Sequence, residues 1–485
     1  MTMKYLYGAA VQGIQNFIFQ TNQLKDIVGA SELVDNICTS AFDQYARNGK
    51  SILRAAGNIK FLFEDEQSCR KAVLEFPRKV MNMAPGITIS QAVVALDNDN
   101  DFPQAIETLE SRLRIQRNLP SKNLAFGYSG VLRSRKTGLP VTKIEDDEYI
   151  DLATDKKREW THSAKFSLCD KFFGHHIMDN SFAYDISNLT GDNEWIAIIH
   201  ADGNGLGKIV QTVGSSIGKL SDFSQALDTS TITAAQKAYE ATIKSDASKD
   251  ITTKAAPFRP IVLGGDDLTV ICRGSLALPF TRYFLDFFEK ETETNLAAIL
   301  KESPGCGIAK LTACAGIAFI KSSYPFYYGY NLAEKLCAEA KKTCKKLEKS
   351  APSCLQFHKV QDSFIEDYGE IIRRELTLDN GSTLAFGPYF LNEREGDGYW
   401  SIEHLEKYSK ELESKEGNAL KSGLRQWLSL AYNSMEEAKQ KGRRIASMLP
   451  TKLKDVYFEA IPQNTDKYPV YDILSLHTIN NQKTK

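Results

Sequence analysis

The hydrophobic and polar positions in the first quarter of the chain predict alternating strands and helices. Short apolar runs and amphipathic helical stretches follow one another in the order βαββαβ, with one added helix. Ala56-Gly57-Asn58 separates two of the apolar runs, which indicates a hairpin. This order is that of a ferredoxin-like split βαβ unit. The predicted elements lie at residues 4–11, 22–47, 51–64, 66–82, 87–96 and 102–118.

The same order of elements returns in the second part of the chain. A strand, a mostly helical stretch, an apolar hairpin, a helix and a strand are followed by a Lys/Glu-rich helix and one further strand. We interpret this return as an internal duplication with a long period and not as a solenoid. The predicted elements lie at residues 194–201, 205–245, 258–274, 276–300, 311–320, 330–348 and 354–360.

We therefore expect an α+β protein with two ferredoxin-like βαββαβ domains and a C-terminal helical domain. The first domain would span residues 1–120 and the second 194–363. A polar and charged connector at 121–193 would join them, and the helical domain would span 364–485. No long Gly/Ser-rich or Pro-rich linker separates these parts, so we expect them to pack together.

The composition limits the class of protein. Its 60 basic and 61 acidic residues give a net charge of −1, which argues against binding nucleic acid mainly by long-range attraction but allows a local contact. The nine cysteines form no CxxC pair, which indicates buried free thiols in a reducing cytoplasm. Neither a signal-peptide pattern nor an apolar run long enough for a membrane span is present. We expect a cytoplasmic protein.

Candidate chemistry begins at the end of the strand predicted over 194–201. Asp202 follows this strand and leads into the turn of Gly203, Asn204 and Gly205. A carboxylate there can bind Mg²⁺, and the backbone N–H groups of such a turn can approach phosphate oxygens. Glycine-rich turns between a strand and a helix are common, so this motif alone is weak evidence.

The hairpin tip supplies a stronger signal. Gly264-Gly265-Asp266-Asp267 places two adjacent acids between apolar strands. Gly and Asp also favour hairpin turns, so the two acids could serve only as turn formers. Adjacent carboxylates beside buried strands repel each other, however, unless a cation lies between them. With Asp202 they would form a cluster that holds one or two Mg²⁺ or Mn²⁺ ions for the reaction of a triphosphate with a hydroxyl.

Five segments together resemble a known family, the large subunit of type III CRISPR effector complexes. Four are similar to its second palm domain, which is related to GGDEF nucleotidyl cyclases and to the palms of polymerases. The N-terminal segment is similar to the opening of the first palm domain, and the resemblance covers most of residues 1–363. The segments are VQGIQNFIFQTNQLKDIVGASELV, IHADGNGLGK, the GGDD hairpin, LTACAGIAFIKSSYPF and LAEKLCAEAKK.

The resemblance implies an activity and roles for individual residues. Two ATP molecules would meet between two palm domains, where a 3′-hydroxyl attacks an α-phosphate to make 3′–5′ linked cyclic oligoadenylates for antiviral signalling. Asp202, Asp266 and Asp267 would bind the metal, and Lys341 would neutralise triphosphate charge. Lys341 could instead be one solvated lysine of its helix. Ser363 lies where the family places a serine that contacts the base.

Alignment of the two halves makes the first palm domain a degenerate copy. Ala10 stands opposite Asp202, and Gly57-Asn58 stands opposite the two acids of the hairpin. The first half therefore lacks the metal carboxylates at the aligned positions. It could supply shape, backbone donors and an acceptor nucleotide, which leaves one catalytic centre in the chain.

The sequence also departs from the family. The palm pattern begins at residue 4, so we expect no HD nuclease domain. The stretch GVLRSRKTGLPVT, where family members often carry zinc-binding cysteines, has none. Cys169 with His175 and His176 is an incomplete set of zinc ligands.

Three functions stay open at this point. The first is an ATP-using cyclic oligonucleotide synthase, the second is a scaffold subunit that binds guide–target RNA or proteins, and the third is a GTP-using cyclase. The resemblance implies ATP, subunits of an RNA-guided effector complex, target RNA and a downstream sensor of the product as partners, and no membrane. Copurification with RNA would favour the scaffold, and product analysis with each nucleotide would separate the two cyclases.

Overall fold

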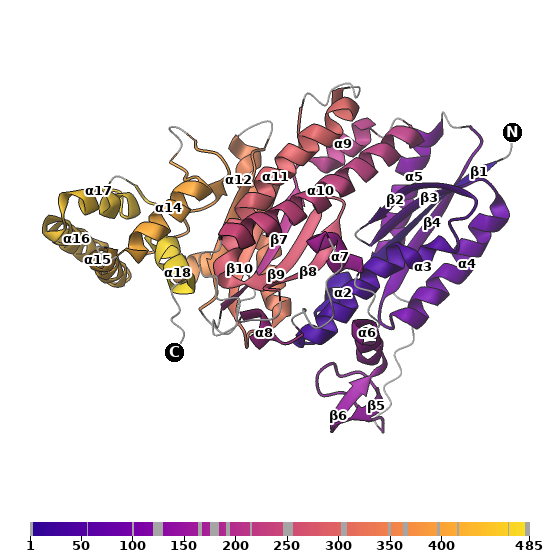
Figure 1. Ribbon diagram of the computed structural model, residues 1–485, viewed down its shortest axis with the longest axis horizontal. Helices are drawn as coiled ribbons and strands as arrows, with labels where there is room; N and C mark the ends of the chain where they lie inside the picture. The colour runs from indigo at the N-terminus through magenta and orange to yellow at the C-terminus, as the bar shows by residue number, and fades with distance from the viewer. Residues whose placement is uncertain are drawn as a thin grey trace.

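A computed structural model describes most of the chain as two large sheets with their helices and one two-stranded sheet, followed by a group of C-terminal helices (Figure 1). The sheet nearest the N-terminus and the C-terminal helices lie at opposite ends, and the second sheet lies between them. The mixed α+β class is confirmed. The described residues are 3–55, 57–98, 101–119, 130–162, 167–174, 184–190, 195–213, 216–245, 256–301, 308–347, 351–361, 367–394, 398–414, 417–463 and 465–480.

The first sheet has antiparallel strands in the order β2-β3-β1-β4. The helix predicted over 22–47 divides in two, because Thr39 leaves the helical conformation and its hydroxyl donates to the Asp35 carbonyl at 2.9 Å. The elements are β1 (Lys4–Gln12), α1 (Ile14–Ile18), α2 (Leu24–Cys38), α3 (Ser40–Asp43), β2 (Gly49–Ala55), β3 (Asn58–Phe63), α4 (Glu66–Met83), β4 (Thr88–Leu96) and α5 (Phe102–Asn118).

Side chains that alternate in direction along β1 pack against helices on both faces of this sheet. Leu6 belongs to a small core with Leu109 of α5, whereas Tyr7 stacks on Phe42 of α3 at a centroid distance of 5.9 Å. Successive side chains of a strand point to opposite faces, so one apolar run serves both layers. The strand predicted from the apolar run at 4–11 therefore has two buried faces.

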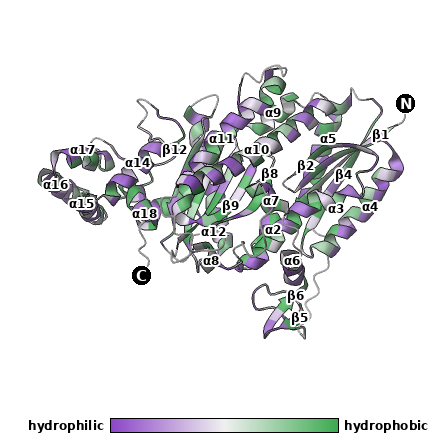
Figure 2. Cartoon of the chain, in the orientation of Figure 1, coloured by the Kyte–Doolittle hydropathy of each residue, from purple (hydrophilic) through white to green (hydrophobic). Residues whose placement is uncertain are grey.

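The second sheet has the strand order β12-β11-β10-β7-β9-β8, with β10 and β11 parallel and the other neighbours antiparallel. Figure 2 shows hydrophobic residues concentrated on its central strands. The elements are β7 (Trp195–Gly203), α9 (Leu206–Val213), α10 (Ile217–Ser245), β8 (Phe258–Gly264), β9 (Asp267–Arg273), α11 (Gly274–Lys301), β10 (Ala313–Lys321), α12 (Phe326–Leu347), β11 (Cys354–Lys359) and β12 (Tyr389–Phe390).

Strand β7 continues two residues beyond its predicted end. Asp202 pairs with Cys314 and Gly203 pairs with Ala313 of β10. Because the ladder extends this far, Asp202 is held by the sheet itself and not by the following turn.

The region between the sheets packs against both of their units. It contains β5 (Val141–Glu145), β6 (Glu148–Asp151), α6 (Leu152–His162), α7 (Ser167–Phe173) and α8 (Ile186–Thr190). Arg158 of α6 pairs with the buried carboxylate of Asp26 at 2.8 Å and with Glu148 at 2.8 Å. Removal of one partner would leave a buried charge uncompensated, so this network holds α6 on α2.

The C-terminal region is mostly helical, as predicted, but it also completes the second sheet. β12 pairs with Leu355 and Cys354 of β11. A strand of two residues has no periodic signal, which is why the sequence pattern missed it. None of the described helices is long and apolar enough to cross a membrane. The helices are α13 (Tyr368–Ile371), which continues into a π-helical turn (Ile372–Leu376), α14 (Ile402–Glu413), α15 (Gly417–Ala431), α16 (Met435–Met448), α17 (Thr451–Ala460) and α18 (Val470–Asn480).

A buried carboxyl joins the last helix to the second sheet and predicts a pH dependence of stability. Tyr389 donates to Asp472 of α18 at 2.7 Å, and burial raises the pKa of Asp472 to about 7. A raised folded-state pKa stabilises the fold at low pH, and this contribution is lost as the pH rises through about 7. We expect the melting temperature to fall between about pH 4 and about pH 7, and Asp472→Asn to remove this part of the change. An identical pH profile for the two proteins would contradict the assignment.

Candidate active site

The end of β7 and the hairpin between β8 and β9 bring three carboxylates together. One oxygen from each of Asp202, Asp266 and Asp267 lies within 4.8 Å of the others. Gly265 forms the turn with a φ of 62°, which favours glycine. Gly203 allows the turn to approach β7, because a Cβ there would lie 3.0 Å from the Cβ of Asp266. The two predicted motifs therefore form one cluster.

The electrostatics of this cluster suit a divalent cation. Burial raises the pKa of Asp266 and of Asp267, and the charge of the neighbouring carboxylates raises both further. A cation with oxygen preference would relieve this repulsion and compensate the loss of water. The donor set of three carboxylates therefore fits Mg²⁺ or Mn²⁺.

Lys341 supplies positive charge at the same place. Its ammonium group pairs with Asp202 and donates to the Gly203 carbonyl at 2.8 Å. The side chain of Lys341 is 16% exposed, whereas that of Lys342 is 67% exposed and pairs with Glu339 at 2.9 Å. Lys342 is therefore a solvated lysine on the helix surface, whereas Lys341 is not.

The remaining residues predicted for nucleotide contact divide into three groups. Asn204 is buried, and its amide donates to the Thr312 hydroxyl at 3.0 Å while its backbone N–H donates to the Thr312 carbonyl at 2.8 Å. Gly205, just before α9, has a φ of 73° and open space around it. Gly264 ends β8 beside the carboxylates. Ser363 lies outside the described residues, as do His175 and His176.

Two residues that the sequence pattern missed fix the hairpin tip from α10. The Gly265 N–H donates to Asp228 at 2.9 Å, and the Thr231 hydroxyl donates to the Gly265 carbonyl at 2.6 Å. Both polar groups of one turn residue are thereby bound to a single helix. No local signal could reveal them, because they lie more than 30 positions before the turn.

We expect Asp228→Ala to weaken the site without unfolding the protein. The Gly265 N–H would lose its acceptor, at a cost of about 1–3 kcal/mol, and the adjacent carboxylates would lose their fixed position. Turnover should fall roughly 10-fold or more, with a higher Mg²⁺ concentration needed for half-maximal rate. Asp228→Asn keeps an acceptor oxygen and should retain most of the activity. Equal rates for all three proteins in a Mg²⁺ titration would contradict this role.

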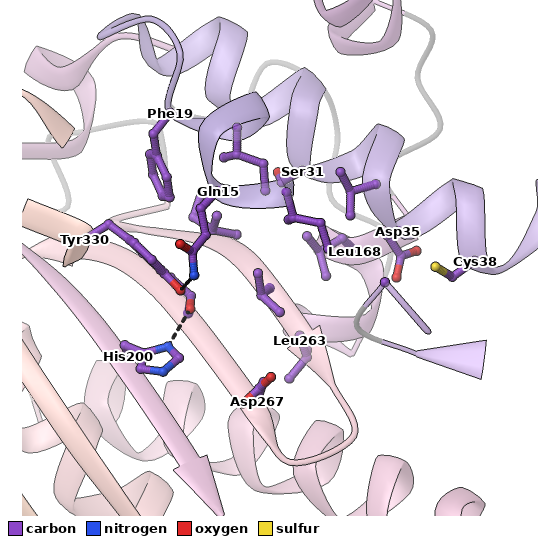
Figure 3. Close-up of a pocket in the computed structure, with 17 residues that line it drawn as sticks. Gln15, Phe19, Ser31, Asp35, Cys38, Leu168, His200, Leu263, Asp267 and Tyr330 are labelled. Carbon is purple, nitrogen blue, oxygen red and sulfur yellow. Dashed lines mark hydrogen bonds between the residues drawn. The ribbon is translucent and has the colours of Figure 1, made fainter. Parts of the chain in front are cut away.

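A cavity of about 140 Å³ opens beside Asp267, with walls from both sheet units (Figure 3). Gln15 donates to the Tyr330 hydroxyl at 3.0 Å across it. His200 lies within 3.1 Å of the Thr269 hydroxyl, and burial lowers its pKa to about 4, so the ring is neutral. Apart from Asp35 and Asp267, the lining is apolar or neutral, which suits an uncharged planar group beside the carboxylates.

The first unit contributes a wall to this cavity but no carboxylate at the aligned positions. Ala10 and Asn58 pair with each other across β1 and β3. Asp35 of α2 does line the cavity, and it accepts a hydrogen bond from Lys171 at 2.7 Å. This carboxylate of the first unit is thus already paired.

Comparison with known families decides the type of domain. Residues 195–349 match the family described as Cas10/Cmr2, second palm domain. These residues form a Cas10/Cmr2 palm domain. The matched range includes the three carboxylates of the palm domain and Lys341. The resemblance to the large subunit of type III CRISPR complexes is confirmed.

Solved structures extend the similarity beyond this palm domain. A Csm1–Csm4 cassette in complex with cA3 is 14% identical with a TM-score of 0.56, and the match covers 99% of this chain and 69% of that chain. A cassette in complex with one ATP is 14% identical with a TM-score of 0.56, covering 99% and 70%. A Csm1–Csm4 subcomplex of the type III-A CRISPR-Csm interference complex is 15% identical with a TM-score of 0.53, covering 99% and 70%. At these identities the likeness shows the fold. A comparison with curated protein sequences finds no match.

Proposed function

We propose that this chain is a nucleotidyltransferase that converts ATP to cyclic oligoadenylate by forming 3′–5′ phosphodiester bonds, in prokaryotic antiviral defence of the type III CRISPR kind. The observation that carries the proposal is the cluster of Asp202, Asp266 and Asp267 beside Lys341, within a Cas10/Cmr2 palm domain. The complexes of similar structures with ATP and with cA3 support the substrate and product class.

The three carboxylates are the proposed metal ligands. One or two Mg²⁺ or Mn²⁺ ions bound there would neutralise triphosphate charge and lower the pKa of the attacking hydroxyl. Lys341 exchanges its contact with Asp202 for a phosphate oxygen when the nucleotide is present. Because Gly203 has no side chain, the hairpin can lie close to β7. Gly264 and Gly265 form the part of the hairpin that places the two acids at the end of this strand.

The proposed phosphate contact is the turn that precedes α9. The N–H groups of Asn204 and Gly265 already donate to Thr312 and Asp228, so they hold the loops in place. Gly205 lies at the N-terminus of α9 in open space, where a helix end favours an anion. Ser363 remains the proposed contact to the base.

We further propose that the two sheet units are two ferredoxin-like palm domains related by duplication, with domain limits at 1–120, 121–193, 194–363 and 364–485. The support is topological. In each unit the strand that begins the unit lies between its third and fourth strands, and the second strand lies outside the third. The first palm, without metal carboxylates, holds the acceptor nucleotide against the cavity.

The partners follow from the same family. Because Csm1 is paired with Csm4 in the similar structures, we propose that this chain assembles with subunits of an RNA-guided complex and responds to target RNA. A downstream protein would sense the product. If the chain were a scaffold without turnover, it would still assemble with these subunits, but the assembly would not require the three carboxylates.

Separate incubation with ATP and with GTP tests the proposed chemistry. The protein is mixed with each nucleotide and Mg²⁺ or Mn²⁺, and the products are separated and identified by mass spectrometry. The proposal predicts cyclic adenylate from ATP and little product from GTP. A cyclic guanylate product would support the GTP-using cyclase instead.

A further inference from the structure

Three cysteines from different elements meet behind the candidate active site. Cys314 lies on β10, Cys354 lies opposite it on the parallel strand β11, and Cys344 lies on α12, which connects these strands. The sulfur of Cys344 is 3.0 Å from that of Cys354 and 3.9 Å from that of Cys314, and the remaining separation is 3.6 Å. All three side chains are buried.

Two of these separations, 3.6 and 3.9 Å, match the roughly 3.8 Å between the sulfur ligands of a tetrahedral zinc ion, and the third is shorter. Non-bonded heavy atoms pack at roughly 3.5–4.0 Å, so the closest pair is nearer than ordinary contact allows. A point about 2.3 Å from all three sulfurs, the usual Zn–S distance, lies about 1 Å outside their plane. An ion there would sit as in a tetrahedral site with one position left for a fourth donor.

We propose that Cys314, Cys344 and Cys354 bind a thiophilic metal ion, Zn²⁺ or Cu⁺, as a structural site of the second palm. Thiolate sulfur selects both of these ions over Mg²⁺ and Ca²⁺. Binding releases the thiol protons to solvent, and no oxidant or reductant is consumed. The surrounding Ala340, Phe390 and half-buried Leu347 exclude water, which favours retention of the ion.

The site would join the elements that carry the candidate catalytic residues. Cys314 is the cross-strand partner of Asp202. Cys344 follows Lys341 by one helical turn on α12. A metal bound to β10, β11 and α12 therefore fixes the distance between the carboxylate and the ammonium group. This inference rests on the sulfur geometry and does not depend on the proposed reaction.

Metal content tests the proposal directly. Protein purified under reducing conditions is dialysed and analysed by inductively coupled plasma mass spectrometry, which distinguishes zinc from copper. We expect about one ion per chain in the wild type and in Cys272→Ala, whose cysteine is buried on β9 outside the cluster. Cys344→Ala and Cys354→Ala should each lose most of it.

A second measurement covers the case in which a variant fails to fold. Wild-type protein is stripped with a chelator and titrated with Cd²⁺, whose thiolate bonds absorb in the near ultraviolet. The expected result is saturation at about one equivalent, with a rise in melting temperature of about 2–4 °C or more. Metal-free protein without this absorption would overturn the proposal. So would an intramolecular disulfide between two of the three cysteines in unreduced protein, detected by peptide mass spectrometry.

Discussion

The double variant Asp266→Ala, Asp267→Ala is expected to form no detectable product from ATP. Both side chains lie at the hairpin tip, so their removal takes away two of the three proposed metal ligands without opening the core. Loss of metal-dependent stabilisation of the transition state should lower the rate by roughly 10³-fold or more. The measurement is ATP consumption and product yield at saturating Mg²⁺.

The fold of this variant provides an internal check. Burial and mutual repulsion raise the pKa values of both carboxyls, so their loss should leave the metal-free protein as stable as the wild type or more so. The matched control is Asn58→Ala in the first hairpin, which should reduce turnover modestly at most. Near wild-type product from the double variant would show that the site has been placed wrongly. Complete loss in Asn58→Ala, with the fold intact, would give the first sheet unit a part in the chemistry.

The second large effect is expected at Lys341. Its ammonium group is mostly buried and pairs with Asp202, so it lies where triphosphate charge would accumulate. A cation in a partly desolvated phosphate site contributes a few kcal/mol, and Lys341→Ala should lower kcat/KM for ATP by roughly 10²-fold. The change should be measured from initial rates over a range of ATP concentrations.

Lys342 is the matched control on the same helix. It points about 100° away from Lys341, and its side chain is largely exposed. Exposed charges are screened, so Lys342→Ala should leave the rate within roughly two-fold of the wild type. Equal and small effects at both positions would return Lys341 to the interpretation as a solvated lysine, and the three carboxylates alone would remain as the candidate site.

The sequence patterns predicted those elements whose structure is determined by their own residues. The apolar run of β7 and the Gly-Gly-Asp-Asp hairpin need no distant partner to be recognised, and the structure forms both. Their meeting was also predictable, because antiparallel neighbours place the end of one strand beside the start of the next. The cluster of three carboxylates follows from this topology.

The features that the patterns missed depend on contacts between distant positions. Asp228 and Thr231 hold Gly265 from a Ser/Asp-rich part of α10, and nothing in their own segment marks them. The three cysteines likewise lack a CxxC spacing, since each comes from a separate element. Only the register of β10 with β11 and the position of α12 bring the sulfur atoms together.

The reaction itself is tested most directly by following labelled ATP and released pyrophosphate together. The full chain is incubated with ATP and Mg²⁺, alone and with coexpressed partner subunits and target RNA. Nucleotidyl transfer predicts one pyrophosphate for each ATP consumed and products whose masses are multiples of an adenylate unit, both absent from the double Asp variant. Intact ATP in both arms, or its conversion to ADP and phosphate, would contradict the account.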